Sequence, residues 1–546
     1  MRLPVLAALA VLSTAAGAQP RLVQLVNADS VVVDATTGET LRTLVGNVAL
    51  RQDTTQLWAD RAVQRVEAGL VTLDGRVRIV SGTDTLTARR VVYDATTEEA
   101  VAEGDVRIAD STSVLLAPSA RHQRRTSVST FNEGGVLYQD GVTLTAPRGV
   151  YDGRREVATV EGGVELRDST MVLTSQRGVY DARAERADFT DDVRLRRRDV
   201  RLDADSLTHF RSTERSLARG RVVLERLGDE RTDDAEGAAP PDSTRRVLLF
   251  GARGEHDGRA GTSRVVGDGG DDPLLVRLRT DSTGATDTTL VRARRLDALR
   301  RDTLAGTLTQ VLGVGAVRLV QRRLAAVADS AAFERLVPAD SLAAVVDRLA
   351  LYGPPRPSVW TEGAQLTGDT LVAHARDESV ERLEVTSGAF AAQLDSVRGR
   401  VRQLAGRQML ARFRDDTLRV LSVWPTAEAI TYRATGDSLL AGGDRLSADS
   451  LAFHFRDGEL REITGSRGIE GVAYGPLILP EPFRLPNYAF DPSARPTRAS
   501  LLAPDAWEAA WLAEDAGREE SEAEGVDPPE GRPLAPVQEG ASSAGG

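Results

Sequence analysis

The chain has 546 residues, of which 41% are hydrophobic and 27% charged, so it has apolar material for two or more folded modules. Its net charge of −11 argues against general nucleic-acid binding, which needs a basic surface to neutralise phosphates. Aromatic residues make up only 4% of the chain, so a buried face must be built mainly from Val, Leu, Ile and Ala.

Residues 1–18 have the pattern of a cleaved export signal. A short basic start, Met1-Arg2, precedes an apolar run at 3–12 and the small-x-small cleavage motif Ala16-Gly17-Ala18. The apolar run is too short to span a bilayer, and the chain has no Cys that could carry a lipid anchor. We therefore expect an exported, soluble mature protein without disulfides, located in the periplasm and possible to find at the outer membrane.

Residues 19–226 follow a period of 29 residues. One aliphatic position recurs at Leu50, Ile79, Ile108, Leu137, Leu166, Leu195 and Leu224. A second recurs at Leu57, Leu86, Leu115, Leu144, Leu173 and Leu202, and a small residue follows each of these two positions later. A fixed period of this size is typical of stacked repeats, in which each unit buries its apolar face only against its neighbours.

Each repeat reads as two strands joined by tight turns. In the clearest repeat, apolar residues alternate with polar ones at Val77, Ile79, Leu86 and Ala88, which is the pattern of strands buried on one face. We therefore expect an all-β fold, an elongated β-jellyroll or β-solenoid of stacked strand pairs. One face of every strand would contribute to a continuous aliphatic lining.

The period ends at a polar loop, and residues 227–352 are expected to form an irregular connector with strands and short helices. Apolar residues three or four positions apart predict a helix over 317–336, namely Val317, Val320, Leu324, Val327 and Ala331. Pro338 would end this helix, and Ser341 would cap a second short helix that ends near Leu349.

The sequence resumes a β pattern after this connector. Residues 353–505 contain alternating segments and hairpin turns, which predict a second β module. Residues 506–546 are acidic and contain Pro, Gly and Ser, which predicts a disordered tail.

The repeat Gly-x-Val-x-Ile … Leu-x-Ala … Val-x-Tyr-Asp, seen at residues 75–94, 104–117 and 163–181, resembles the OstA/LptA-like family of periplasmic lipopolysaccharide-transport proteins. The resemblance covers about 21–226. It implies a jellyroll with an open hydrophobic groove that binds lipid acyl chains during outer-membrane assembly, without enzymatic activity. The partners that it implies are lipopolysaccharide or a related glycolipid.

The open end of a stacked sheet exposes unpaired backbone groups, which can pair with the edge of another chain. We therefore expect edge-strand pairing of this chain with other β-jellyroll transport proteins or with itself.

The inward aliphatic positions are the candidate lining of the lipid groove: Val48, Leu50, Val77, Ile79, Leu86, Val106, Ile108, Leu115, Leu144, Val164, Leu166, Leu173, Val193 and Leu195. A long lining suits acyl chains, because each buried methylene contributes about 0.8 kcal/mol. Taken singly, any such residue is more often part of a dry core. The resemblance favours a groove for the stack as a whole.

Arg194, Arg196 and Arg198 belong to the densest basic cluster and are candidate contacts for a lipid phosphate, because guanidinium groups bind phosphate through paired hydrogen bonds. A solvated strand surface is the alternative.

Catalytic signals are weak. The five His residues lack metal-ligand spacing, and we find neither a nucleophile elbow nor a phosphate-binding loop, so no catalytic residue, metal site or cofactor is predicted. Two other classes remain open, a carbohydrate-active β-helix and a structural surface β-solenoid. The first would need a cluster of acidic residues recurring on one outer face.

Overall fold

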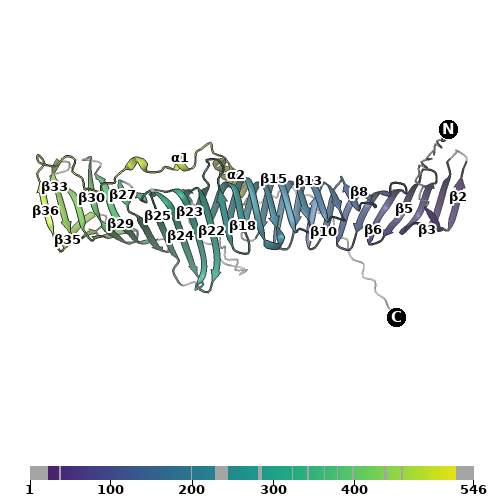
Figure 1. Ribbon diagram of the computed structural model, residues 1–546, viewed down its shortest axis with the longest axis horizontal. Helices are drawn as coiled ribbons and strands as arrows, with labels where there is room; N and C mark the ends of the chain where they lie inside the picture. Colours follow the sequence, from purple (N-terminus) through teal and green to yellow (C-terminus); the bar gives the residue numbers. More distant parts are fainter. Residues whose placement is uncertain are drawn as a thin grey trace, which may run out of the picture. The chain divides into compact units, whose positions relative to one another are not determined.

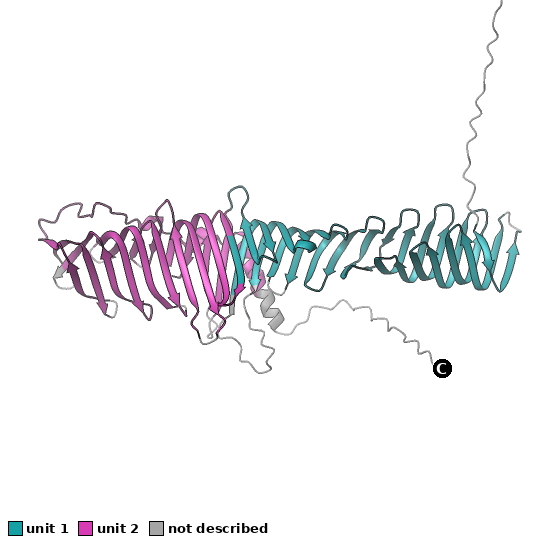
Figure 2. Ribbon diagram, turned by 60° about the horizontal axis from the view of Figure 1, so that its bottom comes forward, with its two compact units in different colours: residues 1–241, 245–271, 297–301 teal, residues 242–244, 272–296, 302–546 magenta. Residues whose placement is uncertain are grey.

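The structure, a computed structural model, describes residues 23–35, 39–197, 200–227, 244–280, 286–322, 324–340, 343–361, 363–377, 379–395, 399–435, 439–456 and 459–523. The described residues form two compact units (Figure 2). Unit 1 comprises residues 1–241, 245–271 and 297–301, and unit 2 comprises 242–244, 272–296 and 302–546. Nearly all of the regular structure is β, which confirms the predicted fold class.

Unit 1 is a run of antiparallel strands that follow one another largely in chain order (Figure 1). They are β1 (Gln24–Asn27), β2 (Ser30–Asp34), β3 (Leu41–Gln52), β4 (Thr55–Arg65), β5 (Leu70–Ser81), β6 (Asp84–Asp94), β7 (Glu99–Ala109), β8 (Ser113–Gln123), β9 (Val128–Phe131), β10 (Gly135–Gln139), β11 (Val142–Ala146), β12 (Arg148–Asp152), β13 (Val157–Arg167), β14 (Met171–Asp181), β15 (Arg186–Arg197), β16 (Val200–Phe210), β17 (Arg215–Leu227), β18 (Thr244–Asp257) and β19 (Thr262–Val266). A 3-10 helix, Arg211–Thr213, links β16 to β17.

The long strands of unit 1 bend at a bulge near their middle, so each contributes to two walls. In β5 the bulge falls at Gly75 and Arg76, which have φ of 75° and 42°. A Cβ on Gly75 would lie 2.5 Å from Asp60 Oδ2, so glycine is required there. Arg76 Nη2 donates to Asp60 Oδ1 at 2.6 Å across the same bend. Such bulges bend a strand and turn its side chains in a new direction.

The first wall, which we call the aliphatic wall, carries one unbroken row of directly opposed residues. The row consists of Leu50, Leu57, Ile79, Leu86, Ile108, Leu115, Leu137, Leu144, Leu166, Leu173, Leu195, Leu202, Leu224 and Leu249. Every member is at most 8% exposed. The 29-residue period of the sequence is therefore the step of two strands along this wall.

Unit 2 continues the all-β pattern with longer and less regular hairpins. Its strands are β20 (Leu274–Thr280), β21 (Thr286–Arg292), β22 (Arg295–Thr303, of which 297–301 belong to unit 1), β23 (Gly306–Gln321), β24 (Leu324–Pro338), β25 (Val346–Tyr352), β26 (Ser358–Trp360), β27 (Ala364–Thr367), β28 (Thr370–Arg376), β29 (Ser379–Asp395), β30 (Arg400–Arg414), β31 (Thr417–Trp424), β32 (Ala427–Thr435), β33 (Leu439–Ala448), β34 (Ser450–Arg456), β35 (Glu459–Ser466) and β36 (Glu470–Tyr474).

The helices predicted at 317–336 and 341–349 are wrong. Residues 306–338 form the hairpin β23–β24, and β25 covers most of the second segment, while Ser341 lies outside the described residues. A bulge after Val314, where Gly315 and Ala316 have φ of 81° and 52°, interrupts the alternation of β23. The turn between β23 and β24 then places two strands in one sequence window. Together they imitate a helical spacing.

After β36 the chain returns along unit 2 as an irregular segment, residues 475–497, which we call the strap (Figure 1). It contains a 3-10 helix, Pro492–Ala494, and leads into α1 (Arg498–Leu501) and α2 (Trp507–Ala523). The disorder predicted from residue 506 is therefore wrong for α2, and residues 524–546 lie outside the described residues. Arg292 Nη2 donates to Glu508 Oε1 at 3.0 Å and so holds the start of α2 to β21.

Candidate functional site: the interior of unit 1

The structure brings all fourteen predicted lining residues together on the aliphatic wall. Nine of them belong to the row described above. The other five are Val residues that each face a small residue on the next strand, in the pairs Val48–Ala59, Val77–Ala88, Val106–Ala117, Val164–Ser175 and Val193–Ala204. All fourteen are buried, with exposures of 0–8%.

The opposite wall, which we call the Tyr/His wall, was missed as a lining by the sequence analysis. It buries one large ring in each of six hairpins: Tyr93, His122, Tyr151, Tyr180, His209 and His256. Each Tyr faces an Ala seven residues later, as in Tyr93–Ala100, Tyr151–Ala158 and Tyr180–Ala187. Each His faces a Ser seven residues later, as in His122–Ser129, His209–Ser216 and His256–Ser263. The shared grid position of these rings was the signal that could have revealed this wall.

Each of these His residues finds its hydrogen-bond partner in the Ser beside it. The Nδ1–Oγ distance is 3.0 Å in all three His–Ser pairs. Burial lowers the pKa of His122 and lowers the pKa of His209 to about 4. Burial also raises the pKa of Tyr93 and raises the pKa of Tyr151 to about 12. These rings are therefore uncharged near neutral pH, which suits an apolar interior.

Polar side chains at the free edge of the aliphatic wall join it to the Tyr/His wall. They repeat every 29 residues, at Gln52, Ser81, Asp110, Gln139, Asp168, Arg197 and Arg226. We call this line the seam. Tyr93 Oη donates to Gln52 Oε1 at 2.7 Å, and Gln52 Nε2 donates to the carbonyl of Ala95 at 3.0 Å.

The same kind of crosspiece recurs along the seam. Arg124 Nη1 donates to Ser81 Oγ at 3.1 Å, and Arg197 Nη2 donates to Glu214 Oε2 at 2.9 Å. Arg124 also pairs with Glu98, a carboxylate whose side chain is only 3% exposed. The two walls thus meet through polar contacts rather than through continuous apolar packing.

The interior is closed in this structure. A cavity of about 20 Å³ lies between the aliphatic residues Ile79, Leu86 and Ile108 and the seam residues near His122 and Arg124. That volume suffices for about one water molecule. The predicted lining is therefore a covered aliphatic wall, and an alkyl chain would need the walls to separate.

The predicted phosphate contacts do not face the interior. Arg194 and Arg196 are exposed and flank the buried Leu195, so they lie on the outer face of the aliphatic wall. Arg198 lies outside the described residues. Arg197, by contrast, is half-buried and reaches Glu214 at the seam.

The Asp residues that recur beside the Tyr rings are turn residues. Asp94 Oδ1 accepts from the backbone N–H of Thr96 at 2.8 Å and of Thr97 at 3.2 Å. Asp152 Oδ1 accepts in the same way from the residues that follow it. This capping role accounts for their recurrence without glycoside chemistry. Among the described residues, no group of three His, Asp or Glu side chains is placed to hold a metal ion.

Comparison with known proteins finds one family. The family described as OstA-like protein matches residues 21–168, a stretch that includes the row from Leu50 to Leu166 and the first three rings of the Tyr/His wall. No curated protein gives a significant match to the chain. Within the described residues, no helix has both the length and the apolar character needed to cross a membrane.

Proposed function

We propose that this chain, an OstA-like protein by its residues 21–168, is a periplasmic carrier or bridge component that shields the acyl chains of lipopolysaccharide or a related glycolipid inside unit 1. The observation that carries the proposal is the unbroken aliphatic row from Leu50 to Leu249. A row of this length offers a continuous apolar path rather than a single pocket. Each methylene that it removes from water contributes about 0.8 kcal/mol.

Lipid entry requires the seam to open, and the energies allow it. A typical hydrogen bond contributes about 0.5–1.5 kcal/mol net, and an exposed ion pair contributes less than about 1 kcal/mol. Several methylenes entering the interior would therefore offset the loss of one crosspiece such as Gln52–Tyr93. The lipid-free protein would keep its walls together and separate them along the length that a ligand occupies.

The exposed N-terminal strands supply the proposed contact with a neighbouring protein. Within the described residues, β1 and β2 pair only with β3. β2 leaves Val31, Val32 and Val33 45%, 61% and 58% exposed. An apolar strand with a free edge suits pairing with the edge of another jellyroll protein or of a second copy. The role is that of a non-enzymatic carrier, and Arg194 and Arg196 would meet headgroup phosphates only on the outer face.

The direct test places a photoreactive amino acid at Ile79, which faces the interior, and at Arg78, which is exposed on the same strand as a matched control. The full chain is illuminated with lipopolysaccharide, and adducts are identified by mass spectrometry. We expect a glycolipid adduct at position 79 and at least tenfold less at position 78. Equal labelling at both positions, or none at position 79, contradicts a lipid path inside unit 1.

A further inference from the structure

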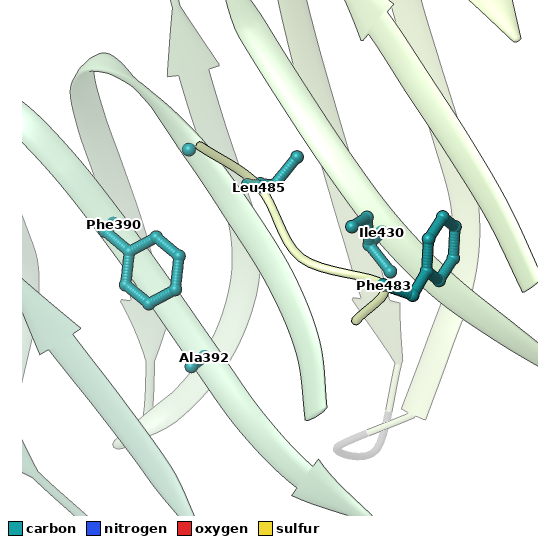
Figure 3. Packing of buried hydrophobic residues seen from close by; sticks show 6 residues of the cluster. Phe390, Ala392, Ile430, Phe483 and Leu485 are labelled. Carbon is teal, nitrogen blue, oxygen red and sulfur yellow. The ribbon is translucent and has the colours of Figure 1, made fainter. Parts of the chain in front are cut away.

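The interior of unit 2 holds a piece of the same chain. Phe483 and Leu485 of the strap are 8% and 2% exposed and pack against Phe390, Ala392 and Ile430 (Figure 3). Tyr488 continues this contact, with its ring centroid 5.9 Å from that of Phe390 in an edge-on arrangement. The strap thus occupies the space between strands that would otherwise form an open trough.

The floor of this trough has one cross-strand row that alternates amide and apolar side chains. Gln365 lies opposite Ala392, Ala392 lies opposite Gln403, and Gln403 lies opposite Ile430. Trp360 begins the row beside Gln365. Gln365 and Gln403 are each 4% exposed, so their amides are almost completely removed from water.

Both amides bind the backbone of the strap, and each binds residues two apart. Gln403 Nε2 donates to the carbonyl of Phe483 at 3.1 Å, and its Oε1 accepts from the N–H of Leu485 at 2.8 Å. Gln365 Nε2 donates to the carbonyl of Ala489 at 2.7 Å, and its Oε1 accepts from the N–H of Asp491 at 2.7 Å. Trp360 Nε1 adds a bond to the carbonyl of Asp491 at 3.0 Å.

This arrangement selects a polypeptide over an alkyl chain. A side-chain amide that donates to residue i and accepts from residue i+2 presents the same pair of groups as a neighbouring strand. An acyl chain in the same place would leave two buried amides without partners, and each such loss costs about 1–3 kcal/mol. The trough is therefore chemically unlike the aliphatic wall of unit 1.

We propose that the interior of unit 2 is a peptide-binding trough, that its ligand is the chain's own segment 483–491, and that this ligand keeps acyl chains out of unit 2. Recognition runs through the backbone at Gln365 and Gln403 and through apolar side chains at Phe483 and Leu485. The inference goes beyond the proposed carrier function, because it confines the lipid path to unit 1. Recognition of the peptide stands without that function.

The first experiment measures peptide binding in trans to the full chain. Phe483→Asp with Leu485→Asp places charges in the trough and should displace the strap. A labelled synthetic peptide of residues 481–493 should then bind this variant at least tenfold more tightly than it binds the unaltered chain. Adding Gln365→Ala and Gln403→Ala should weaken that binding at least tenfold.

Gln393→Ala is the matched control, because Gln393 is exposed on β29 next to Ala392. It should leave peptide binding to the displaced variant unchanged. Equal binding to the unaltered and displaced chains, or no effect of the two amide substitutions, overturns the proposal.

A second measurement avoids any variant that fails to fold. In the unaltered chain the backbone N–H of Leu485 and Asp491 should be protected from hydrogen exchange, and Gln403→Ala alone should speed exchange at Leu485 at least tenfold. Gln393→Ala should change neither rate. Rapid exchange at both positions in the unaltered chain overturns the trough, whatever the behaviour of the charged variants.

A third measurement separates this proposal from the carrier function. A photoreactive residue at Ala392 should label the strap, whereas one at Ile79 should label glycolipid. Glycolipid labelling at position 392 of the unaltered chain overturns the exclusion of acyl chains. Peptide binding as expected with no glycolipid at position 79 supports the trough and overturns the carrier function instead.

Discussion

The rings of the Tyr/His wall show how single residues solve the problem of a buried polar atom. Tyr93 extends its hydroxyl to Gln52 at the seam, so an Ala suffices beside its ring. A His ring is shorter and has a nitrogen near its own strand, and a Ser on the next strand satisfies it. Tyr with Ala and His with Ser are thus two matched solutions for one position.

The pairing predicts a rescue. Ser216→Ala leaves the buried His209 Nδ1 without its partner and should lower the free energy of unfolding by about 1–3 kcal/mol. His209→Tyr combined with Ser216→Ala recreates the pair found at Tyr180–Ala187 and should recover much of that loss. Denaturant unfolding of the full chain measures both. The exposed Ser212→Ala should stay within about 0.5 kcal/mol, and a double variant no more stable than Ser216→Ala would refute the matching rule.

The same residues predict acid sensitivity. The pKa of His209 falls from about 6.5 in an unfolded chain to about 4 in the folded one, so the neutral ring belongs to the native state. Its stabilising contribution is complete above pH 6.5 and is lost as the pH falls from about 6.5 through 4, by as much as about 3 kcal/mol. Unfolding free energies at pH 7, 5.5 and 4 should show this fall. The double variant His209→Tyr with Ser216→Ala should show a shallower one, and parallel curves would exclude His209 as a cause.

At the scale of strands, the period of the sequence was sufficient to place the aliphatic wall and insufficient to place the rest. Leu50 to Leu195 recur at one spacing, and strand alternation fixes their face, so the buried row could be predicted. The bulge at Gly75 and Arg76 shifts that alternation by one residue, which hides the second wall from a simple count. The hairpin β23–β24 failed for a related reason, because its bulge and its turn combine into a helical spacing. The strap was not predicted because an irregular segment carries no period.

Where a strand of the Tyr/His wall has Gly, a Phe ring fills the space. A Cβ on Gly178 would lie 2.5 Å from Cε1 of Phe189, the residue opposite it on β15. Gly178→Ala should therefore destabilise the chain by about 1–3 kcal/mol through overpacking. Gly178→Ala with Phe189→Leu should relieve the clash, as the Leu207–Ala218 pair does two strands further on. Thermal unfolding compares the two variants, and equal losses would argue against overpacking as the mechanism.

At the scale of the whole molecule, the free edge at β2 is the feature that bears on assembly. An apolar strand with unpaired backbone groups tends to pair with another strand unless a charge is placed on it. Val32 is 61% exposed in the middle of β2 and offers the place for such a charge.

Val32→Lys should lower association of the chain with itself, or with a jellyroll partner, at least tenfold, as followed by sedimentation over a range of concentrations. The folded monomer should keep its stability, because the side chain faces solvent. Leu304→Lys, in a fully exposed turn of unit 2 with 105% relative exposure, serves as the control of equal charge. Equal effects of the two substitutions would indicate a general charge effect rather than pairing at β2.

The crosspieces of the seam also bear on how such a molecule can change its reach. Ser81 meets Arg124 and Asp168 meets Arg211, so the partners stand 43 residues apart in both cases, although each wall repeats every 29 residues. A duplication or loss of one whole repeat carries every such partner along by the same step and recreates the fastening around the junction. The length of unit 1 is therefore adjustable in increments of two strands. A span matched to a given distance between membranes could evolve by copying repeats, without the invention of a new joint.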